Sequence, residues 1–506
     1  MRCRVDGGAR YPPDPTREES NYWTQSLLSK RKKLGHALPQ RSFEEDPTVA
    51  SVRSTRNVYA ERVNAADQTL SIKYRPVADL KLDSKNPRIH TQKQIRQIAS
   101  SITAFGFNVP VLVNGKGKVV AGHGRVLACQ LLGIDQVPTI ALEHLSDVQA
   151  QAFLLADNKL TENATWDDRL LAEQLQELSK VELNFSLEVT GFEMGEIDVM
   201  IEGLSPAPNG DTDDADVLPE SDDELTITKV GDLWVLGPHR VLCADSLKAE
   251  NYSCLMEGLR AAAVITDPPF NDPIDGYVSG FGKIHHPEFA MASGEMTKSE
   301  FTEFLTTVFT RMADASAAGS LHYIFMDWRH TEELLKAAGG VFSEFKALCV
   351  WDKGTGGQGS LYRSQHELVF IFKRGTGKHQ NNVQLAQFGR YRTNVWCYPR
   401  TNSLSQRSEE GNLSAFHPTV KPVAMIADAI MDCSGRNDIV LDPFLGSGST
   451  LIAAERAGRC CYGIEIEPRY VDTIVRRWEA FTGKTAVHMK SGKTWKGIEE
   501  ETNAQR

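Results

Sequence analysis

The chain has 506 residues, of which 41% are hydrophobic and 24% charged, and its formal net charge is −10. That length suffices for about three domains of roughly 150 residues each. No apolar run reaches roughly 18 residues, which excludes a transmembrane helix, and the first residues lack a signal-peptide pattern. The nine cysteines show no Cys-x-x-Cys spacing, so we expect neither a zinc site nor disulfides, and a reduced, cytoplasmic protein.

Residues 1–69 are expected to form a flexible amino-terminal segment. They mix Pro, Arg and Glu and show no sustained hydrophobic periodicity. The basic run Lys30–Lys33 stands out within them. Such a run is usually a solvated surface, and the alternative is a contact with nucleic acid.

Residues 70–145 are predicted to form a small α+β domain. Apolar residues recur at helical spacing over 95–105, and Gly106 follows as a stop signal. The apolar runs 109–113 and 119–121 flank a Gly-Lys-Gly-Lys turn, a pattern that indicates a β-hairpin.

The hairpin leads directly into Gly122-His123-Gly124-Arg125 and then a helical run. Glycines at a strand-to-helix junction let backbone amides approach an anion, and the helix amino terminus adds positive potential there. An arginine beside them can bridge phosphate oxygens. These four residues are therefore the candidate phosphate-binding site of the domain, and an ordinary tight turn is the alternative.

With its opening Asn86-Pro87-Arg88 and this glycine-arginine box, the segment resembles the ParB/sulfiredoxin-like domain over roughly 75 residues. The resemblance implies nucleotide binding at the box, and some family members are nucleases or hydrolyse CTP. His123-Gly124-Arg125 stands where partition proteins typically have Glu-Arg-Arg, which argues against CTP hydrolysis and leaves phosphate binding in place. A nucleotide is the ligand that this resemblance suggests.

Two further segments separate this domain from the rest of the chain. Residues 146–204 are predicted to be a helical extension that packs against the domain. Residues 205–224 hold eight acidic side chains and no Lys or Arg, and the remaining 58 of the 66 Asp and Glu nearly balance the 56 Lys and Arg. This acidic stretch is predicted to be a solvated linker. The net charge therefore does not argue against a polyanionic partner.

Residues 225–490 are predicted to form a Rossmann-like α/β domain with a mainly parallel sheet, followed by a tail, 491–506. Three runs predicted to be buried strands each end in residues that can bind a ligand or take part in catalysis. The motifs are Asp267-Pro268-Pro269-Phe270, the loop from Asp442 to Thr450, and Glu465. Ligands of such sheets bind past the carboxyl ends of the strands, so we expect the three motifs to meet.

The glycine loop predicts a nucleotide-like ligand. Gly446 and Gly448 allow close backbone approach, and Glu465 lies about where an acidic residue holds ribose hydroxyls. The dinucleotide fingerprint is incomplete, because Leu451 replaces its third glycine, and no complete P-loop occurs. The expected ligand is an adenosine compound without a pyrophosphate, and S-adenosylmethionine fits that description.

The Asp-Pro-Pro-Phe motif predicts a site for an exocyclic amine. Asp267 and the Pro268 carbonyl can accept both amine hydrogens, because prolines fix φ and remove N–H donors. Phe270 can stack on a planar heterocycle, which positions the nitrogen for in-line attack on a methyl group. In duplex DNA such an amine is reached by flipping the base. A turn built on Asp-Pro-Pro-Phe is the alternative.

Over about 227–486 the chain resembles the amino-methylating DNA methyltransferases, which act on adenine N6 or cytosine N4. Besides the two motifs above, the likeness includes the runs 362–368, 394–396 and His417-Pro418-Thr419-Val420-Lys421-Pro422. It implies S-adenosylmethionine as cofactor. The residues implied to hold it are Asp245, Ser246, Asp442, Phe444, Gly446, Gly448, Thr450, Glu465, His417, Thr419 and Lys421.

The order of the motifs bears on the target base. The catalytic motif precedes the glycine loop, which is the β-class order, and many cytosine N4 enzymes have Ser in place of Asp267. Both features favour adenine N6, and cytosine N4 is the alternative. Phe270 stands where the family usually has Tyr, and its ring can still stack.

The expected DNA contacts lie in 373–407, which holds seven Lys or Arg and no acidic residue, with aromatic residues interleaved. In β-class enzymes the target-recognition segment also lies between the catalytic motif and the run that corresponds here to His417–Pro422. The expected contacts are Lys373, Arg374, Lys378, Arg390, Arg392 and Arg400. A solvated basic loop is the alternative. Double-stranded DNA is the expected partner, and a homodimer is suggested because β-class enzymes often dimerise.

The sequence thus predicts an S-adenosylmethionine-dependent, site-specific DNA adenine methyltransferase fused to a ParB-like domain, as in restriction-modification or mobile DNA. One alternative is a nucleotide-dependent ParB-like DNA-binding protein with a vestigial methylase half, against which the intact motifs argue. Another is a nuclease in the amino-terminal domain, for which no residue constellation stands out. His285 and His286 lack a second ligand pair, so no metal site is predicted.

Overall fold

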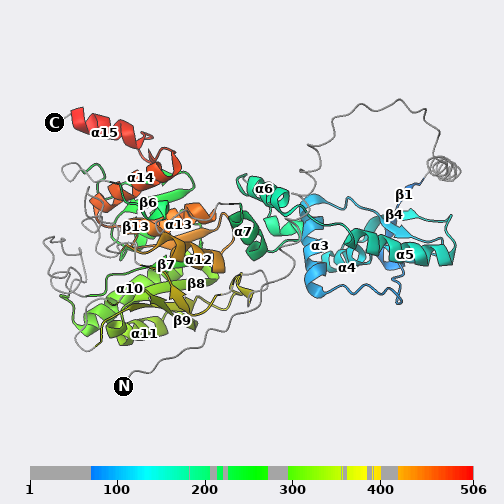
Figure 1. Cartoon of the computed structure of the whole chain (residues 1–506), viewed down its shortest axis with the longest axis horizontal. Helices are drawn as coiled ribbons and strands as arrows, with labels where there is room; N and C mark the ends of the chain where they lie inside the picture. Colours follow the sequence, from blue (N-terminus) through cyan, green and yellow to red (C-terminus); the bar gives the residue numbers. More distant parts are fainter. Residues whose placement is uncertain are drawn as a thin grey trace, which may run out of the picture. The chain divides into compact units, whose positions relative to one another are not determined.

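The computed structural model describes most of the chain beyond residue 69 (Figure 1). The described residues are 70–181, 183–204, 213–219, 226–271, 294–354, 356, 362–384, 390, 392–399 and 420–504. The chain divides into two compact units, Met1–Ser71 and Ile72–Arg506, and the elements below belong to the second. Several predictions concern residues outside the described ranges, namely the segment 1–69, His285, His286, Arg400, His417 and Thr419.

The region predicted as a small α+β domain contains a four-stranded sheet with the order β1-β4-β2-β3. Its strands are β1 (Ile72–Pro76), β2 (Val111–Val113), β3 (Val119–Ala121) and β4 (Gln136–Ala141). The helices of this region are η2 (Val77–Asp79), α3 (Gln92–Phe105) and α4 (His123–Leu132). Strands β2 and β3 form the predicted antiparallel hairpin, and α3 ends at Gly106 as predicted. Valines of the sheet and Cys129 of α4 form the core of this region.

Helices follow over 146–204, as the sequence predicts. They are α5 (Asp147–Glu162), α6 (Asp168–Ser179), η3 (Leu187–Thr190) and α7 (Met194–Glu202). Ser146 begins α5 with a capping box, and Asp167 caps α6. Leu171, Ile197 and neighbouring apolar residues form a separate small core between α6 and α7.

The structure corrects the expectation of a solvated linker where residues of 205–224 are described. Residues 213–219 contain η4 (Asp214–Asp216), and Ala215 is 3% exposed. The Asp216 carboxylate accepts a hydrogen bond from the Val423 backbone N–H at 2.8 Å, and Arg477 donates to the Ala215 carbonyl at 2.8 Å. The acidic composition predicted solvation, but these few polar contacts and a buried alanine hold 213–219 on the α/β domain.

The carboxyl-terminal region is built on a ten-stranded sheet with the order β11-β9-β10-β8-β7-β12-β13-β6-β5-β14. The strands preceding the candidate site are β5 (Leu233–Leu236), β6 (His239–Cys243), β7 (Ala261–Thr266) and β8 (Ser316–Met326). The remaining strands are β9 (Glu344–Asp352), β10 (His366–Lys373), β11 (Val395–Cys397), β12 (Ile439–Asp442), β13 (Cys460–Glu465) and β14 (Val487–His488). The central strands β8, β7, β12, β13 and β6 are mutually parallel.

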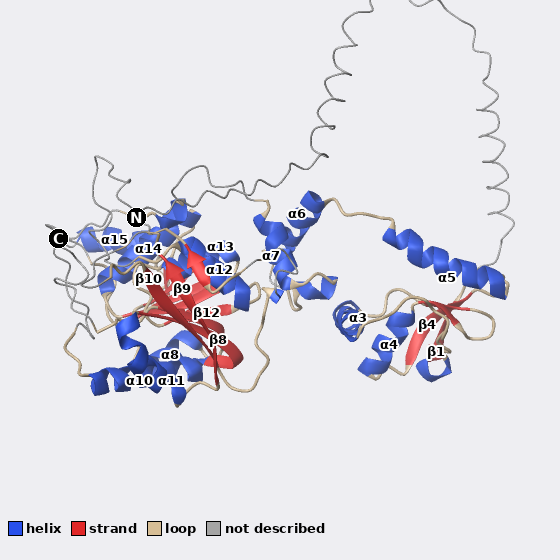
Figure 2. Ribbon diagram, turned by 60° about the horizontal axis from the view of Figure 1, so that its bottom comes forward, coloured by secondary structure: helices blue, strands red, loops and turns tan. Residues whose placement is uncertain are grey.

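Helices cover both faces of this sheet (Figure 2). One face packs on α8 (Ala249–Met256), α10 (Lys298–Ala315) and α11 (Thr331–Gly339), with η5 (Trp328–His330) beside α11. The other packs on α12 (Val423–Cys433), α13 (Ser449–Ala457) and α14 (Pro468–Thr482). Alternate residues of β7 enter the two cores, since Ala263 and Ile265 face one and Val264 the other. This three-layer, Rossmann-like arrangement confirms the predicted fold class.

The segment 491–506, predicted only as a tail, contains a helix in its described part. Helix α15 (Trp495–Ala504) begins with Trp495, which is 2% exposed. Its ring lies 5.0 Å from that of Trp234 on β5, and a large aromatic ring gains much from such burial. No described helix is long and apolar enough to cross a membrane.

Candidate active site

The predicted motifs meet at one edge of the sheet. Asp267 follows β7, Asp442 ends β12, Glu465 ends β13 and Asp245 follows β6, and these four strands are adjacent and parallel. The chain order reverses between β7 and β12, because β8 lies on one side and β13 on the other. Ligands of doubly wound sheets bind at such a switch point. The sheet therefore places the Asp-Pro-Pro-Phe motif beside the glycine loop.

Asp442 shapes the glycine loop from within. Its carboxylate accepts hydrogen bonds from the Thr450 hydroxyl at 2.7 Å, the Thr266 hydroxyl at 2.9 Å and the Phe444 backbone N–H at 3.1 Å. Burial raises the pKa of Asp442 to about 6, against these hydrogen bonds. Asp442 and Thr450, both expected to hold the cofactor, thus contact each other and brace the loop.

Glu465 connects the loop to the neighbouring strand. Its two carboxylate oxygens accept the backbone N–H groups of Gly446 at 2.8 Å and Glu467 at 2.9 Å. Burial raises the pKa of Glu465 to about 7. Each oxygen has a further lone pair, so the carboxylate can still accept hydrogen bonds from hydroxyl groups of a ligand.

The loop itself requires glycine at two positions. Gly446 and Gly448 have φ values of 54° and 84°, in the left-handed region that side chains disfavour. A Cβ at Gly448 would also lie 3.0 Å from Cγ1 of Ile474 on α14. The loop can therefore pass close to both the helix and a ligand only without side chains.

The other expected cofactor residues line the same edge. The Asp245 carboxylate accepts the Leu247 backbone N–H at 2.9 Å, and Ser246 is 3% exposed. Phe444 packs against Phe304 of α10 with the ring centroids 6.1 Å apart. The backbone N–H of Ala244 donates to the Glu465 carbonyl at 2.9 Å, which ties the two strand ends together.

Asp267 has two chemically different oxygens. Oδ2 accepts a hydrogen bond from the Lys421 ammonium, whereas Oδ1 is buried without a hydrogen-bond partner. The side chain is 24% exposed. Burial raises the pKa of Asp267 to about 6, against the opposing charge of Lys421. The motif thus presents one free carboxylate oxygen.

This contact adds a second partner to the expected role of Lys421, whose contact with the cofactor stays a prediction. The family resemblance suggested that Lys421 holds the cofactor, but its ammonium contacts the catalytic motif, because the segment before α12 reaches the end of β7. Phe270 is half-buried, and its ring centroid lies 5.8 Å from Lys421 Nζ. Lys421 therefore belongs with Asp267 and Phe270.

Two charged residues of this site escaped prediction. Glu367, near the start of β10, accepts hydrogen bonds from Lys353 Nζ at 2.6 Å and pairs with Lys421 Nζ at 2.9 Å. Glu367 lies in the run 362–368 that resembles the family, but that likeness assigned it no role. Lys353 follows β9 without any motif around it, so only the sheet order could bring it here.

The structure corrects the expected DNA contacts of Arg390 and Arg392. Arg390 pairs with Asp432 at 3.0 Å and Arg392 with Asp428 at 2.9 Å, both acids lying on α12. The Arg390 side chain is 6% exposed. Guanidinium groups used in this way are not available to phosphates. The signal that could have revealed it is the acidic pair Asp428 and Asp432, spaced one helical turn apart on an otherwise apolar helix.

Lys373, Arg374 and Lys378 lie at the other edge of the sheet. Strand β10 runs antiparallel to β8, so Lys373 pairs with Leu321, which in turn pairs with Ala263 near the start of β7. Asp267 follows the opposite end of β7. The structure therefore does not bring these three basic residues to the catalytic motif, and their contact with DNA stays a prediction.

The glycine-arginine box is held by contacts within its own domain. Gly122 caps α4 with a φ of 99°, and the Arg125 guanidinium donates to the carbonyls of Val109 at 2.6 Å and Pro110 at 3.1 Å. His123 is 7% exposed, and its Nε2 accepts the Asp83 backbone N–H at 3.4 Å. Burial lowers the pKa of His123. These are contacts of the tight-turn alternative, and phosphate binding stays a prediction.

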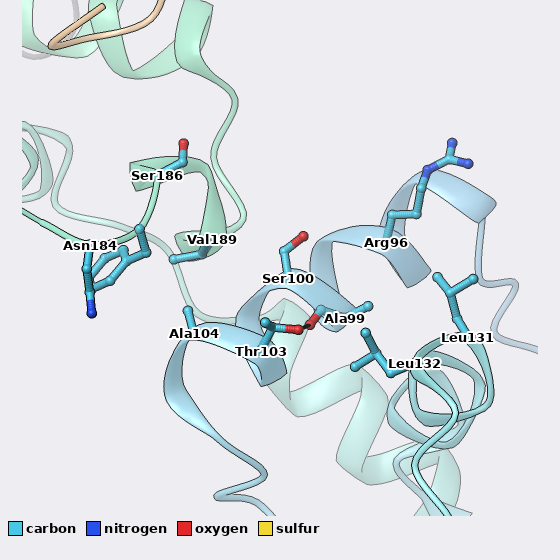
Figure 3. A pocket seen from close by; sticks show the side chains of 11 residues that line it. Arg96, Ala99, Ser100, Thr103, Ala104, Leu131, Leu132, Asn184, Ser186 and Val189 are labelled. Atoms are coloured by element: carbon cyan, nitrogen blue, oxygen red, sulfur yellow. Dashed lines mark hydrogen bonds between the residues drawn. The ribbon is translucent and has the colours of Figure 1, made fainter. Parts of the chain in front are cut away.

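A separate groove of about 560 Å³ lies beside α3 (Figure 3). It is lined by α3, the end of α4 and residues 184–189, with Arg96 as the charged residue among them. The Thr103 hydroxyl donates to the Ala99 carbonyl within α3 at 2.9 Å. None of the residues predicted to act lines this groove. The described residues also hold no cluster of His, Cys, Asp or Glu suited to a metal ion.

Comparison with known proteins assigns three regions of the chain. Residues 261–476 match the family described as DNA methylase (N6/N4 type), 169–229 match the ParB-methyltransferase HTH domain, and 61–159 match the ParB N-terminal domain. The second match covers helices that the sequence analysis interpreted only as an extension.

Individual relatives agree with these matches. A ParB-like nuclease domain-containing protein of Escherichia coli (strain K12), YnaK, is 44% identical over 84 residues, which cover 17% of this chain and 97% of the relative. The type II methyltransferase M.ScaI of Streptomyces caespitosus is 39% identical over 103 residues, 20% of this chain and a third (33%) of that protein.

A solved structure also aligns with the carboxyl-terminal region. The crystal structure of M1.HpyAVI in complex with SAM shares 21% identity, covering 47% of this chain and 97% of that chain, with a TM-score of 0.35. Together with the family matches to the methylase and ParB regions, the relatives that share them decide the assignment. The chain thus combines a region of the amino-methylating (N6/N4) DNA methyltransferase family, over 261–476, with an amino-terminal ParB-like domain.

Proposed function

We propose that the protein transfers a methyl group from S-adenosylmethionine to the N6 amine of adenine in double-stranded DNA. The observation that carries this proposal is the free, buried Oδ1 of Asp267 beside the glycine loop on the neighbouring strand. A buried acceptor without a partner is costly, so a donor is expected to reach it during function. An exocyclic amine is such a donor.

The residues at the strand ends fit the cofactor. Gly446 and Gly448 leave the loop open to close approach, and Glu465 retains acceptor capacity for ribose hydroxyls. Asp245, Ser246 and Phe444 would complete the adenosine site on the adjacent strand ends. When bound, S-adenosylmethionine supplies an electrophilic methyl group on a sulfonium.

The chain's own groups orient the target amine. Asp267 Oδ1 and the Pro268 carbonyl accept its two hydrogens, and Phe270 stacks on the flipped base. The nitrogen lone pair then forms the new N–C bond while the electron pair of the broken S–C bond remains on sulfur. The nitrogen gives up one proton, which the Asp267 carboxylate can accept before releasing it to water.

The choice of adenine N6 rests on Asp267 at the first position of the motif and on the β-class motif order. Cytosine N4 is the alternative, since the family acts on both amines. The two bases present the same exocyclic amine to Asp267, so contacts with the rest of the base ring must discriminate between them.

The DNA is proposed to lie across the catalytic edge of the sheet. Two large aromatic side chains project there, Trp328 after β8 and Tyr362 before β10, with exposed fractions of 58% and 84%. The Arg329 guanidinium stacks on Trp328 at 5.4 Å. Exposed aromatic rings can stack on bases that a flipping enzyme unstacks.

The test is transfer of a labelled methyl group to unmethylated genomic DNA, followed by mass spectrometry of the nucleosides. N6-methyladenine is the expected product. N4-methylcytosine would retain the mechanism and overturn the choice of base. Bound cofactor without any transfer would overturn the proposed function, and a parallel binding measurement with S-adenosylmethionine separates that case from a misfolded preparation.

A further inference from the structure

Four charged side chains form a continuous series of ion pairs at the catalytic motif. Lys353 Nζ lies 2.6 Å from Glu367 Oε2, Glu367 Oε1 lies 2.9 Å from Lys421 Nζ, and Lys421 donates to Asp267 Oδ2. The residues come from the ends of β9, β10 and β7 and from the segment before α12. Positive and negative charges alternate along this series, so the four side chains together are neutral.

Three of these four side chains are largely enclosed by the protein. The side chains of Lys421 and Glu367 are each 6% exposed, and that of Lys353 is 15% exposed. Buried charges are tolerated only when they are paired. The alternation of signs is therefore a condition for burying these groups, and removing any one member leaves the group with a net charge.

Aromatic rings surround the Lys421 ammonium. Its Nζ lies 5.3 Å from the centroid of Phe325, 5.8 Å from that of Phe270 and 5.9 Å from that of Trp351. Rings at such distances attract a cation through their negative faces. Lys421 is thus held in place by two carboxylates and three rings, which is unusual for a flexible side chain with four rotatable bonds.

The consequence falls on Asp267. A carboxylate on a strand end can rotate, and either oxygen can then face the target. With Oδ2 bound to a fixed ammonium, Oδ1 is the oxygen that remains, and it is buried and without a partner. A neighbouring positive charge also favours the ionised carboxylate, which accepts hydrogen bonds better than the acid does.

We propose that Lys421 is a positioning residue that orients and ionises Asp267 for the target amine, and that Glu367 and Lys353 hold Lys421 in that place. This inference rests on the proposed methyl transfer. It assigns Lys421 to the base-binding half of the site instead of the cofactor half, and it gives Glu367 and Lys353 a role that no motif suggested.

The charges around Asp267 predict opposite effects for two substitutions. Lys421 and Lys353 favour the ionised form of Asp267, whereas Glu367 and the buried Asp442 at the end of β12 oppose it. Removing the Lys421 charge should therefore raise the pKa of Asp267, and removing the Glu367 charge should lower it. A role confined to packing would move neither.

The experiment measures kcat/KM for DNA methylation against pH for the wild-type protein, Lys421→Met, Lys421→Arg and Glu367→Gln. The acid limb of the wild-type profile is expected near pH 6. We expect Lys421→Met to move it up and Glu367→Gln to move it down, each by about one unit. Lys421→Arg retains the charge and is expected to keep the limb within a few tenths of the wild-type position.

Affinity for S-adenosylmethionine, measured by calorimetry, is the control for folding and for the cofactor role. It should change less than about threefold in Lys421→Met. Loss of a direct contact with the cofactor would instead weaken binding about tenfold, which corresponds to about 1.4 kcal/mol. Unshifted limbs, limbs that move in the same direction, or a selective loss of cofactor binding would overturn the inference while the wild-type enzyme stays active. Absence of transfer by the wild-type protein would instead overturn the proposed function.

Discussion

Asp198 of α7 and Arg459, just before β13, form a buried bidentate ion pair. Nη1 lies 2.9 Å from Oδ1 and Nη2 lies 2.7 Å from Oδ2, and the side chains are at most 1% exposed. Arg436 joins the same carboxylate at 3.2 Å. Helix α7 lies in the region that matches an HTH domain. In the described structure this helix is held against the methyltransferase region by the buried ion pair and by its contacts with α12.

Asp198→Asn should lower the free energy of unfolding by about 3 kcal/mol, because it leaves two buried guanidinium groups without their counter-charge. Urea denaturation measures the effect. The matched control is Glu173→Gln, which breaks an exposed ion pair with Arg169 on α6 and should cost less than about 0.5 kcal/mol. Equal losses for the two variants would contradict the structural importance of the buried pair.

Asp267→Ala should reduce the rate of methyl transfer at least about 100-fold, because the target amine loses its charged acceptor. Affinity for S-adenosylmethionine should persist, since the cofactor residues lie on other strands. Asp314→Asn, on an exposed position of α10, serves as the control and should retain the wild-type rate. Undiminished turnover by Asp267→Ala would exclude the assigned mechanism.

Gly448→Ala should both destabilise the protein and weaken cofactor binding. Its φ of 84° costs an L-residue about 1–2 kcal/mol, and the added Cβ would press on Ile474. Gly339→Ala at the end of α11 is the matched control, because nothing lies within 4 Å of its Cβ position. Thermal unfolding and calorimetric titration measure the two effects, and a Gly448→Ala protein that binds like wild type would contradict the tight fit of the loop.

Glu465 predicts a pH-dependent stability. Burial raises its pKa from 4.5 to about 7, so the folded state binds a proton that the unfolded state releases. Its favourable contribution is complete below pH 4.5 and is lost as the pH rises through 7. Relative to Glu465→Gln, the wild-type free energy of unfolding should fall by about 3 kcal/mol across that window. Urea titrations of both proteins at several pH values measure it, and a constant difference would refute the raised pKa.

Arg390→Gln should lower the free energy of unfolding by about 3 kcal/mol, because Asp428 and Asp432 on α12 lose one of the two guanidinium groups that compensate their charges. DNA affinity per folded molecule should keep the wild-type salt dependence. If Arg390 contacted a phosphate instead, the slope of log K against log salt would fall by about one. Lys378→Gln is the control. Lys378 is exposed and lies at the edge of the sheet away from Asp267, so its substitution should change stability by less than about 0.5 kcal/mol.

Local sequence was sufficient to predict the motifs and to place them at the ends of strands. The hairpin around β2 and β3, the stop of α3 at Gly106 and the placement of Asp267, Asp442 and Glu465 after buried strands all follow from short-range rules. Glycines with positive φ, prolines and runs of apolar residues act through the backbone of their own segment. The parallel α/β pattern then brings the strand ends to one edge, whatever the rest of the fold does.

The tertiary structure alone decided the electrostatic partners. The basic run that includes Arg390 and Arg392 predicted a DNA surface, because in sequence its acidic partners Asp428 and Asp432 lie far away. The antiparallel direction of β10 carried Lys373 to the far edge and Glu367 to the catalytic one. Charge pairing acts through space at a few ångströms, and only the order and direction of the strands determine which charges come that close.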